Sequence, residues 1–251
     1  MPIREFNIFR RHKRQYIPDL RAVELIPLFR GRPVIAENIM PEEEERIIQI
    51  CPTGAIQSSP TRMDIGKCVF CRECAFALPG KIKFTNDHRL AVNSRENFII
   101  SAGEDKPIRL DPEKIRKEIR SYFRHALKLR QVSAAGDNAS EMELNAAGNV
   151  NFDMGRYGIE FVASPRHADG IVITGPVSEN MSKALQICYD AIPEPKLVIL
   201  CGTDAISGGI FADSPAIDRT FLEKTHVDLF IPGNPPHPLT FINGILDMLG
   251  R

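Results

Sequence analysis

The chain has 251 residues, of which 43% are hydrophobic and 25% charged, and its formal net charge is zero. This is an ordinary composition for a soluble globular protein, and the length allows two modest domains. No apolar run approaches the roughly 20 residues that a membrane-spanning helix needs, and the basic N-terminus lacks the apolar stretch of a secretory signal. These features argue against an integral membrane protein and against a secreted one.

The zero net charge hides an asymmetry between the two halves. Residues 1–130 hold 25 Lys and Arg against 17 Asp and Glu, which gives +8, whereas residues 131–251 hold 7 against 15, which gives −8. Opposite signs suggest two domains and a basic face for an acidic partner or a membrane surface. Nucleic-acid binding is disfavoured because the basic residues are scattered and no aromatic platform accompanies them.

The first hundred residues predict an arm followed by a small domain. Residues 1–36 are basic and include Pro18, Pro27 and Pro33, so we expect an extended arm that packs on something else, such as a partner subunit. Residues 41–50 predict a helix, because Pro41 suits the first helical position and four glutamates crowd the first turn. Short strands are expected at residues 63–65, 81–85 and 90–92, with a turn at Asn86-Asp87. The small domain covers residues 37–103.

A connecting helix is expected within residues 104–131. Pro112 follows an Asp cap, and apolar residues recur at helical spacing up to about Arg130. The opposite face is rich in Lys and Arg, which indicates a solvated surface or, alternatively, a docking face.

Residues 132–251 have the pattern of a parallel α/β sheet. Strand-like runs at 159–163, 170–174, 196–201 and 227–231 alternate with a helical stretch at 179–191. Ligand-binding loops in such sheets follow the carboxyl ends of the strands. Here these loops are residues 175–177, 202–204 and 232–236.

Four cysteines form the strongest motif in the chain. Three lie in Cys68-Val-Phe-Cys71-Arg-Glu-Cys74, and the fourth begins the dipeptide Cys51-Pro52. Ferredoxins with two 4Fe–4S clusters carry two C-x2-C-x2-C-x3-C-P motifs, and the last Cys of each binds the other motif's cluster. Cys51 and the three later cysteines therefore make one complete ligand set, which predicts one 4Fe–4S cluster in a ferredoxin-like α+β domain.

The remaining motif positions support this interpretation. Those of the other cluster hold Pro41, Glu44, Ile47 and Leu78, so one cluster has lost every ligand while the other has kept all four. A zinc site is the main alternative, since sets of four cysteines also bind zinc. Free thiols are a further alternative.

The C-terminal part resembles a known family. Its motifs begin with residues 156–160 (RYGIE) and 163–169 (ASPRHAD), and continue in order with residues 174–177, 189–196, 207–209 and 231–238. Over residues 130–249 they resemble the twenty-kilodalton subunit of respiratory complex I and the small subunits of energy-converting NiFe hydrogenases. The resemblance implies a flavodoxin-like α/β domain, covering residues 132–251. In that family the domain holds a 4Fe–4S cluster that delivers electrons to quinone or to a NiFe site.

The family's four cluster cysteines are missing here. The resemblance places them at Asp137, Ser140, Asp204 and Asn234. Iron–sulfur clusters need thiolates, so we expect no cluster in this domain. A Mg²⁺ or Ca²⁺ site at these oxygen ligands is an alternative to small polar residues that fill a wet pocket, and thiolates supplied by an adjacent chain are another.

The other candidate residues carry weaker signals. Cys188 and Cys201 match no family ligand position and are expected to be buried free thiols. His167 and His237 are expected to have structural roles. No dinucleotide fingerprint and no nucleophile–base pair stands out.

The sequence thus predicts an electron-transfer subunit of a membrane-associated oxidoreductase, with one cluster at Cys51, Cys68, Cys71 and Cys74. The resemblance implies a large-subunit-like partner, other iron–sulfur or membrane subunits, and a peripheral place on the cytoplasmic membrane. Catalysis by this chain alone is not expected. The alternative is a structural or redox-sensing adaptor that uses the cluster as a folding staple.

Overall fold

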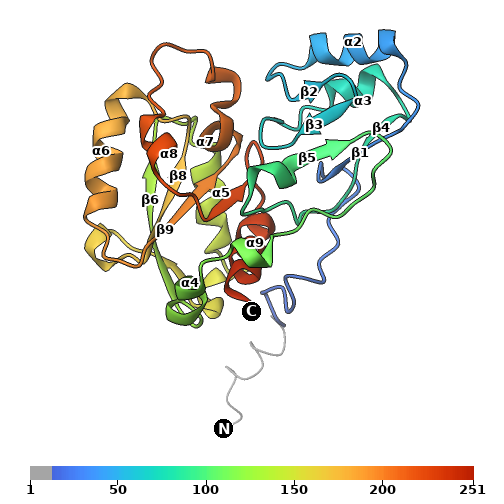
Figure 1. The fold of residues 1–251 in the computed structure, drawn as a ribbon. Coiled ribbons are helices and arrows are strands. Elements are labelled where there is room, and N and C mark those ends of the chain that lie inside the picture. The colour runs from blue at the N-terminus through green and yellow to red at the C-terminus, as the bar shows by residue number, and fades with distance from the viewer. Residues whose placement is uncertain (1–12) are drawn as a thin grey trace.

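The structure is a computed structural model that describes residues 13–251, so the first part of the expected arm lies outside the described residues. Two parts lie side by side: a small N-terminal part and a larger part built on a parallel sheet (Figure 1). No helix within residues 13–251 is long and apolar enough to cross a bilayer.

Among the described residues, the N-terminal part contains two α-helices and five short strands. The helices are α2 (Pro41–Ile50) and α3 (Glu73–Ala77). Strands β1 (Pro33–Ile35) and β4 (Ile82–Phe84) pair antiparallel, and β2 (Ile56–Gln57), β3 (Arg62–Asp64) and β5 (Ile99–Ser101) form a second antiparallel sheet. Helix α2 has the predicted bounds, and the carboxylate of Glu43 accepts the N–H of Met40 at 2.9 Å across its first turn.

The strand expected at residues 90–92 is wrong. Val92 instead exchanges two backbone hydrogen bonds with Phe230, at 3.0 and 2.7 Å. Because Phe230 lies in the last strand of the large sheet, this bridge ties the N-terminal part to the sheet.

The larger part is a doubly wound parallel sheet, as the sequence predicts. Its strands are β6 (Leu127–Ser133), β7 (Ile159–Phe161), β8 (Gly170–Thr174), β9 (Leu197–Cys201) and β10 (Leu229–Ile231). Their order is β10-β9-β8-β6-β7, and every pair is parallel. In chain order this is the 2-1-3-4-5 arrangement of flavodoxin-like sheets.

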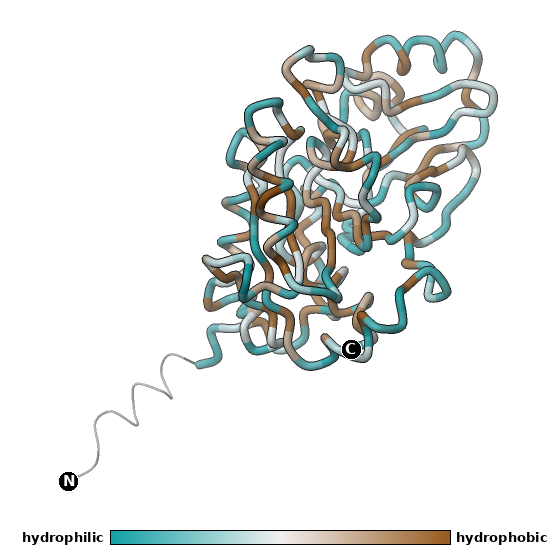
Figure 2. Tube along the Cα trace, turned by 60° about the vertical axis from the view of Figure 1, so that its left-hand side comes forward, coloured by the Kyte–Doolittle hydropathy of each residue, from teal (hydrophilic) through white to brown (hydrophobic). Residues whose placement is uncertain are grey.

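Helices cover both faces of this sheet (Figure 1). Within β8, Ile171 and Ile173 join the core shared with α6 (Glu179–Asp190), while Val172 joins the core shared with α9 (Pro238–Leu249). This alternation follows from the two-residue period of a strand. The hydrophobic stretches (brown in Figure 2) run mainly through the interior strands and helices. The other helices are α5 (Ala139–Ala147), α7 (Thr203–Ser207) and α8 (Thr220–Lys224).

The long connecting helix expected up to residue 130 is wrong. Residues 112–114 form a single 3-10 turn, α4 covers only Lys117–Tyr122, and β6 begins at Leu127. Leu127 and Leu129 are fully buried while Lys128 between them is exposed, which is a strand pattern. The apolar residues of this segment therefore recur first at the spacing of a helix and then at the two-residue spacing of a strand.

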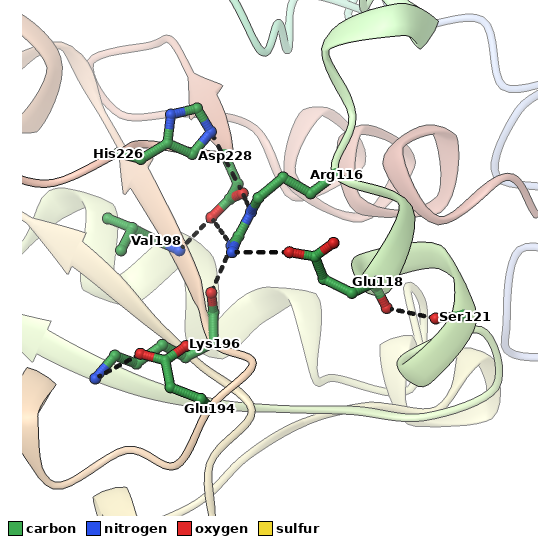
Figure 3. A network of polar contacts seen from close by, with 8 residues as sticks. All are labelled: Arg116, Glu118, Ser121, Glu194, Lys196, Val198, His226 and Asp228. Carbon is green, nitrogen blue, oxygen red and sulfur yellow. Dashed lines mark hydrogen bonds and ion pairs between the residues drawn. The ribbon is translucent and has the colours of Figure 1, made fainter.

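A polar network fastens the connecting segment to the sheet (Figure 3). The guanidinium of Arg116 donates to both carboxylate oxygens of Asp228, at 2.7 and 2.9 Å. Asp228 is buried, and it also accepts the backbone N–H of Val198 at 2.9 Å.

The described part of the arm lies against its own chain. Leu20 is 1% exposed within the core around α9, and its carbonyl accepts a hydrogen bond from the Asn243 amide at 3.0 Å. The sequence predicts an arm that packs on something else, such as a partner subunit; for this part of it, the chain's own last helix offers the apolar surface.

Candidate metal centre

The four predicted ligand cysteines line one pocket in the N-terminal part, here called the cysteine pocket. Cys51 follows the last residue of α2, Cys68 and Cys71 lie in the loop before α3, and Cys74 lies within α3. The remaining wall is largely apolar and includes Ile56, Met63 and Phe84. Residues from two separate segments of the chain are thus brought to a single site.

Backbone N–H groups point at two of the four sulfur atoms. The N–H of Ala55 donates to Sγ of Cys51 and the N–H of Phe70 donates to Sγ of Cys68, both at 3.3 Å. Phe70 has a φ of 54°, in the left-handed region that a bulky side chain seldom adopts. Hydrogen bonds of this kind favour the thiolate that metal binding requires.

The cysteine pocket disfavours thiolates that lack a bound cation. Burial raises the pKa of Cys68 well above the ordinary value of a thiol. The pKa of Cys74 is raised to about 11, first by burial and then by the neighbouring charges of Cys71 and Cys51. A cationic metal centre offsets such repulsion and deprotonates its thiol ligands. The residues present therefore fit a metal centre with thiolate ligands.

The sheet-edge loops, residues 134–140, 202–208 and 232–236, meet at the carboxyl ends of β6, β9 and β10. The N–H of Thr203 donates to the carbonyl of Gly233 at 2.8 Å. A Cβ atom added to Gly202, whose φ is +99°, would lie only 2.5 Å from Oγ of Ser140. The loops that carry Ser140, Asp204 and Asn234 are therefore close neighbours, as the resemblance implies.

Two buried carboxyl groups lie here, that of Asp204 in these loops and that of Glu141, which directly follows them in α5. Asp204 is 8% exposed, and its Oδ1 has no hydrogen-bond partner among the described residues. Burial raises its pKa to about 6, with smaller contributions from Asp137 and Glu141. Glu141 is 6% exposed; its Oε1 accepts hydrogen bonds from Ser133 and Thr174, both at 2.6 Å, and its Oε2 has no partner among residues 13–251.

Sequence reasoning did not find Glu141. The only signal was indirect: Ser133 and Thr174 are polar residues at the ends of two buried strands, where a polar partner is needed.

No three His, Cys, Asp or Glu side chains within the described chain converge closely enough to hold a single metal ion. This applies to the sheet-edge loops, for which the sequence leaves a Mg²⁺ or Ca²⁺ site open, and equally to the cysteine pocket. A cluster with four corners spreads its ligands more widely than one ion does.

The cysteine pocket and the sheet-edge loops are in direct contact. The hydroxyl of Thr203 donates to the carbonyl of Cys68 at 2.8 Å, and this pair is buried. Phe70 and Asn234 line a common cavity, and Arg30 of the arm donates to the carbonyl of Phe70 at 2.8 Å. The loop that carries Cys68 is therefore seated on the edge of the sheet.

The weaker sequence candidates have structural positions. Cys201 is fully buried at the end of β9, as expected, whereas Cys188 is only half-buried. His237 caps α9 by accepting the N–H of Leu239 at 3.1 Å, and its ring packs edge-on against two phenylalanines. His167 is exposed in a 3-10 turn at Pro165–His167.

Comparison with known proteins relates the sheet-bearing part to a redox family. The family model of the NADH ubiquinone oxidoreductase 20 kDa subunit matches residues 138–248. A probable membrane-bound hydrogenase subunit, mbhJ of Pyrococcus furiosus, is 34% identical over 115 residues, which cover 46% of this chain and 69% of that protein. An NADH-quinone oxidoreductase subunit of Clostridium beijerinckii is 45% identical over 112 residues, which cover 43% of this chain and 64% of that protein.

Among solved structures, a chain of an archaeal membrane-bound sulfane sulfur reductase is similar, with 27% identity and a TM-score of 0.46. The similarity covers 53% of this chain and 73% of that one. This chain thus spans about two thirds of the length of the curated relatives named above, and the matches lie in its sheet-bearing part. Through that part, the chain belongs to the family of the NADH ubiquinone oxidoreductase 20 kDa subunit.

Proposed function

We propose that this chain is an iron–sulfur electron-transfer subunit of a membrane-associated oxidoreductase similar to complex I or to membrane-bound hydrogenases. One 4Fe–4S cluster would be held by Cys51, Cys68, Cys71 and Cys74 in a ferredoxin-like domain. The observation that carries the proposal is that these four cysteines line one pocket. Family membership supports the oxidoreductase assignment, and relatives named as subunits of larger enzymes support a peripheral place beside partner subunits.

The spacing of the cysteines, with a third thiol at Cys74 and the dipeptide Cys51-Pro52, favours a cluster over zinc. When bound, such a cluster accepts and releases single electrons. The chain's own contribution is to supply four thiolates, to donate N–H groups to two sulfurs, and to keep water away with an apolar wall. The sheet-bearing part, without cysteine at Asp137, Ser140, Asp204 and Asn234, would carry no cluster and would serve as a docking scaffold.

The decisive experiment measures iron, acid-labile sulfide and zinc per chain on anaerobically purified protein. We expect about four iron and four sulfide atoms per chain. About eight of each would contradict the assignment, because the sheet-edge loops would then also hold a cluster. One zinc with almost no iron would place the chain among structural proteins.

A structural adaptor is the second candidate, and one contact favours it. The hydrogen bond from Thr203 to the carbonyl of Cys68 joins the cysteine loop to the sheet, so a cluster there would fasten the two parts together. A potentiometric titration distinguishes the two functions. A reversible one-electron step between about −700 and +450 mV, the range of iron–sulfur centres, supports electron transfer. A cluster that is not reduced reversibly supports the adaptor.

A further inference from the structure

A second site, independent of the cysteine pocket, lies where the arm, the connecting segment and α9 meet. It is a cleft of about 600 Å³, within the size range of small-molecule sites. Its wall includes four arginines from four different segments of the chain: Arg21, Arg89, Arg109 and Arg120. We call it the arginine cleft.

Three of these four arginines keep free donors. Arg109 makes no side-chain hydrogen bond with any described residue, and it is exposed. Arg89 uses one terminal nitrogen, which donates to the carbonyl of Arg21 at 2.9 Å. Arg120 uses only Nε, which donates to the carbonyl of Met248 at 3.2 Å. A guanidinium has five N–H donors, so most of those on these three residues remain available to a ligand.

The two acidic residues of the cleft are already engaged. Asp247 forms an ion pair with Arg21, which also donates to the main-chain oxygen of Arg251. Asp87 accepts the N–H of Arg89 at 3.0 Å and lies 3.6 Å from the guanidinium of Arg32. Among the described side chains that line the cleft, four arginines against two carboxylates leave an excess of two positive charges at neutral pH.

The rest of the wall limits the kind of ligand. It is aliphatic or polar, with Ala91, Ile108, Leu110 and Ile115 among its members, and the described residues of this wall include no aromatic side chain. A planar ring would therefore find no stacking partner. Arginine forks bind phosphate oxygens in pairs, which gives both strength and orientation.

We propose that the arginine cleft binds a phosphate ester, with Arg89, Arg109 and Arg120 as the ligating residues. The ester is a monoester, carried either by a small soluble molecule or by a lipid headgroup such as that of phosphatidic acid, and both sources present a terminal phosphate to the three guanidinium groups.

The test uses the full chain with its cluster and inorganic pyrophosphate as the probe. Isothermal titration calorimetry at low ionic strength compares the wild type, Arg109→Gln, the double variant R89Q/R109Q, and Arg46→Gln. The last is the control, because Arg46 is an exposed arginine of α2 outside the cleft. We expect the affinity to fall by about tenfold or more in the double variant, since a charged hydrogen bond contributes about 1.5–3 kcal/mol. Arg46→Gln should bind as the wild type does.

Flotation with vesicles identifies the source of the phosphate. The cleft is assigned to a lipid headgroup if the protein binds phosphatidic acid vesicles but not phosphatidylcholine vesicles. Pyrophosphate should then displace the protein from these vesicles, and R89Q/R109Q should abolish the binding. Pyrophosphate binding without such vesicle binding assigns it to a soluble ester. The proposal is overturned if the wild type binds neither probe, or if R89Q/R109Q binds both as the wild type does. Unchanged circular dichroism of the variants would show that they remain folded.

Discussion

The cysteine pocket and the sheet-edge loops are neighbours in the structure, yet they offer a metal opposite kinds of ligand. The first gathers four thiols, backbone N–H donors and an apolar wall. The second gathers carboxyl, hydroxyl and amide groups, including two buried carboxyl oxygens without a partner among the described residues. Family membership rests on the second region, whereas the proposed cofactor rests on the first.

This difference teaches that the sheet and its convergent loops do not need cysteine ligands. The parallel sheet has a flavodoxin-like strand order, and its loops converge, although Asp137, Ser140, Asp204 and Asn234 carry no thiol. Its stability must come from packing and from partly buried polar pairs such as Arg116–Asp228. The small N-terminal part has short strands and less core, so we expect it to depend on its metal centre.

The largest expected effect is the loss of iron from Cys68→Ser. Cys68 is buried and accepts the N–H of Phe70, and a serine hydroxyl is a poor ligand for iron–sulfur clusters. Iron should fall from about four per chain to below about one, as measured by metal analysis and visible absorbance. Cys188→Ser is the matched control and should keep its iron. An unchanged iron content in Cys68→Ser would contradict the assignment of Cys68 as a cluster ligand.

The next effect concerns stability on the sheet side. Asp228→Ala leaves the Arg116 guanidinium and the Val198 N–H without their shared partner. Arg116 is partly exposed, so water offsets some of the loss, and we expect about 2–3 kcal/mol of destabilisation. Chemical denaturation measures it, with Glu118→Ala, at the exposed rim of the same network, as a control that costs under about 0.5 kcal/mol. Loss of iron in folded Asp228→Ala would show that the two regions are not independent.

A pH-dependent effect sharpens the description of the sheet-edge loops. Because the pKa of Asp204 is raised from 3.8 to about 6, its protonated form stabilises the fold below pH 3.8, and that contribution is lost as the pH rises through about 6. Asp204→Asn should therefore be more stable than the wild type at pH 7.5, with the difference shrinking towards pH 4. Denaturation at both pH values measures it. An equal difference at both would mean that Asp204 does not titrate in this range.

The smallest effect tests the contact between the two regions. Thr203→Val removes the hydroxyl that donates to the carbonyl of Cys68. We expect a loss of about 1 kcal/mol in the free energy of unfolding, because a buried carbonyl loses its partner. Thr220→Val, at an exposed site in α8, is the control. An unchanged midpoint would mean that the cysteine loop is held by its other contacts alone.

Local patterns were enough to predict part of the structure. Pro41 and the acidic first turn located α2, and the apolar run of β8 gave that strand its observed bounds. The spacing of the cysteines predicted that residues of two segments would lie together, and all four line one pocket.

Other features had no local signal. Helix α9 is buried along nearly its whole length, so it lacks the periodic polar face by which a surface helix is recognised. Tyr122 fits a helical stripe in the sequence but is 70% exposed, and the residues after it follow the period of a strand. The buried carboxyl of Glu141 accepts hydrogen bonds from Ser133 and Thr174 of two different strands, which only the assembled sheet brings together.

The burial of α9 has a consequence for biosynthesis. Asn243 bonds the carbonyl of Leu20 across 223 residues of chain, Thr240 bonds the carbonyl of His88, and Gly244 packs so closely on Ala91 that an added Cβ would lie 2.5 Å from its methyl group. Contacts of such long range form late, because the whole chain must emerge before they can close. The arm therefore emerges from the ribosome long before α9, the surface on which it packs, has been synthesised. A nascent chain interrupted before Pro238 would leave Leu20 and Ala91 uncovered, as a substrate for chaperones and proteases.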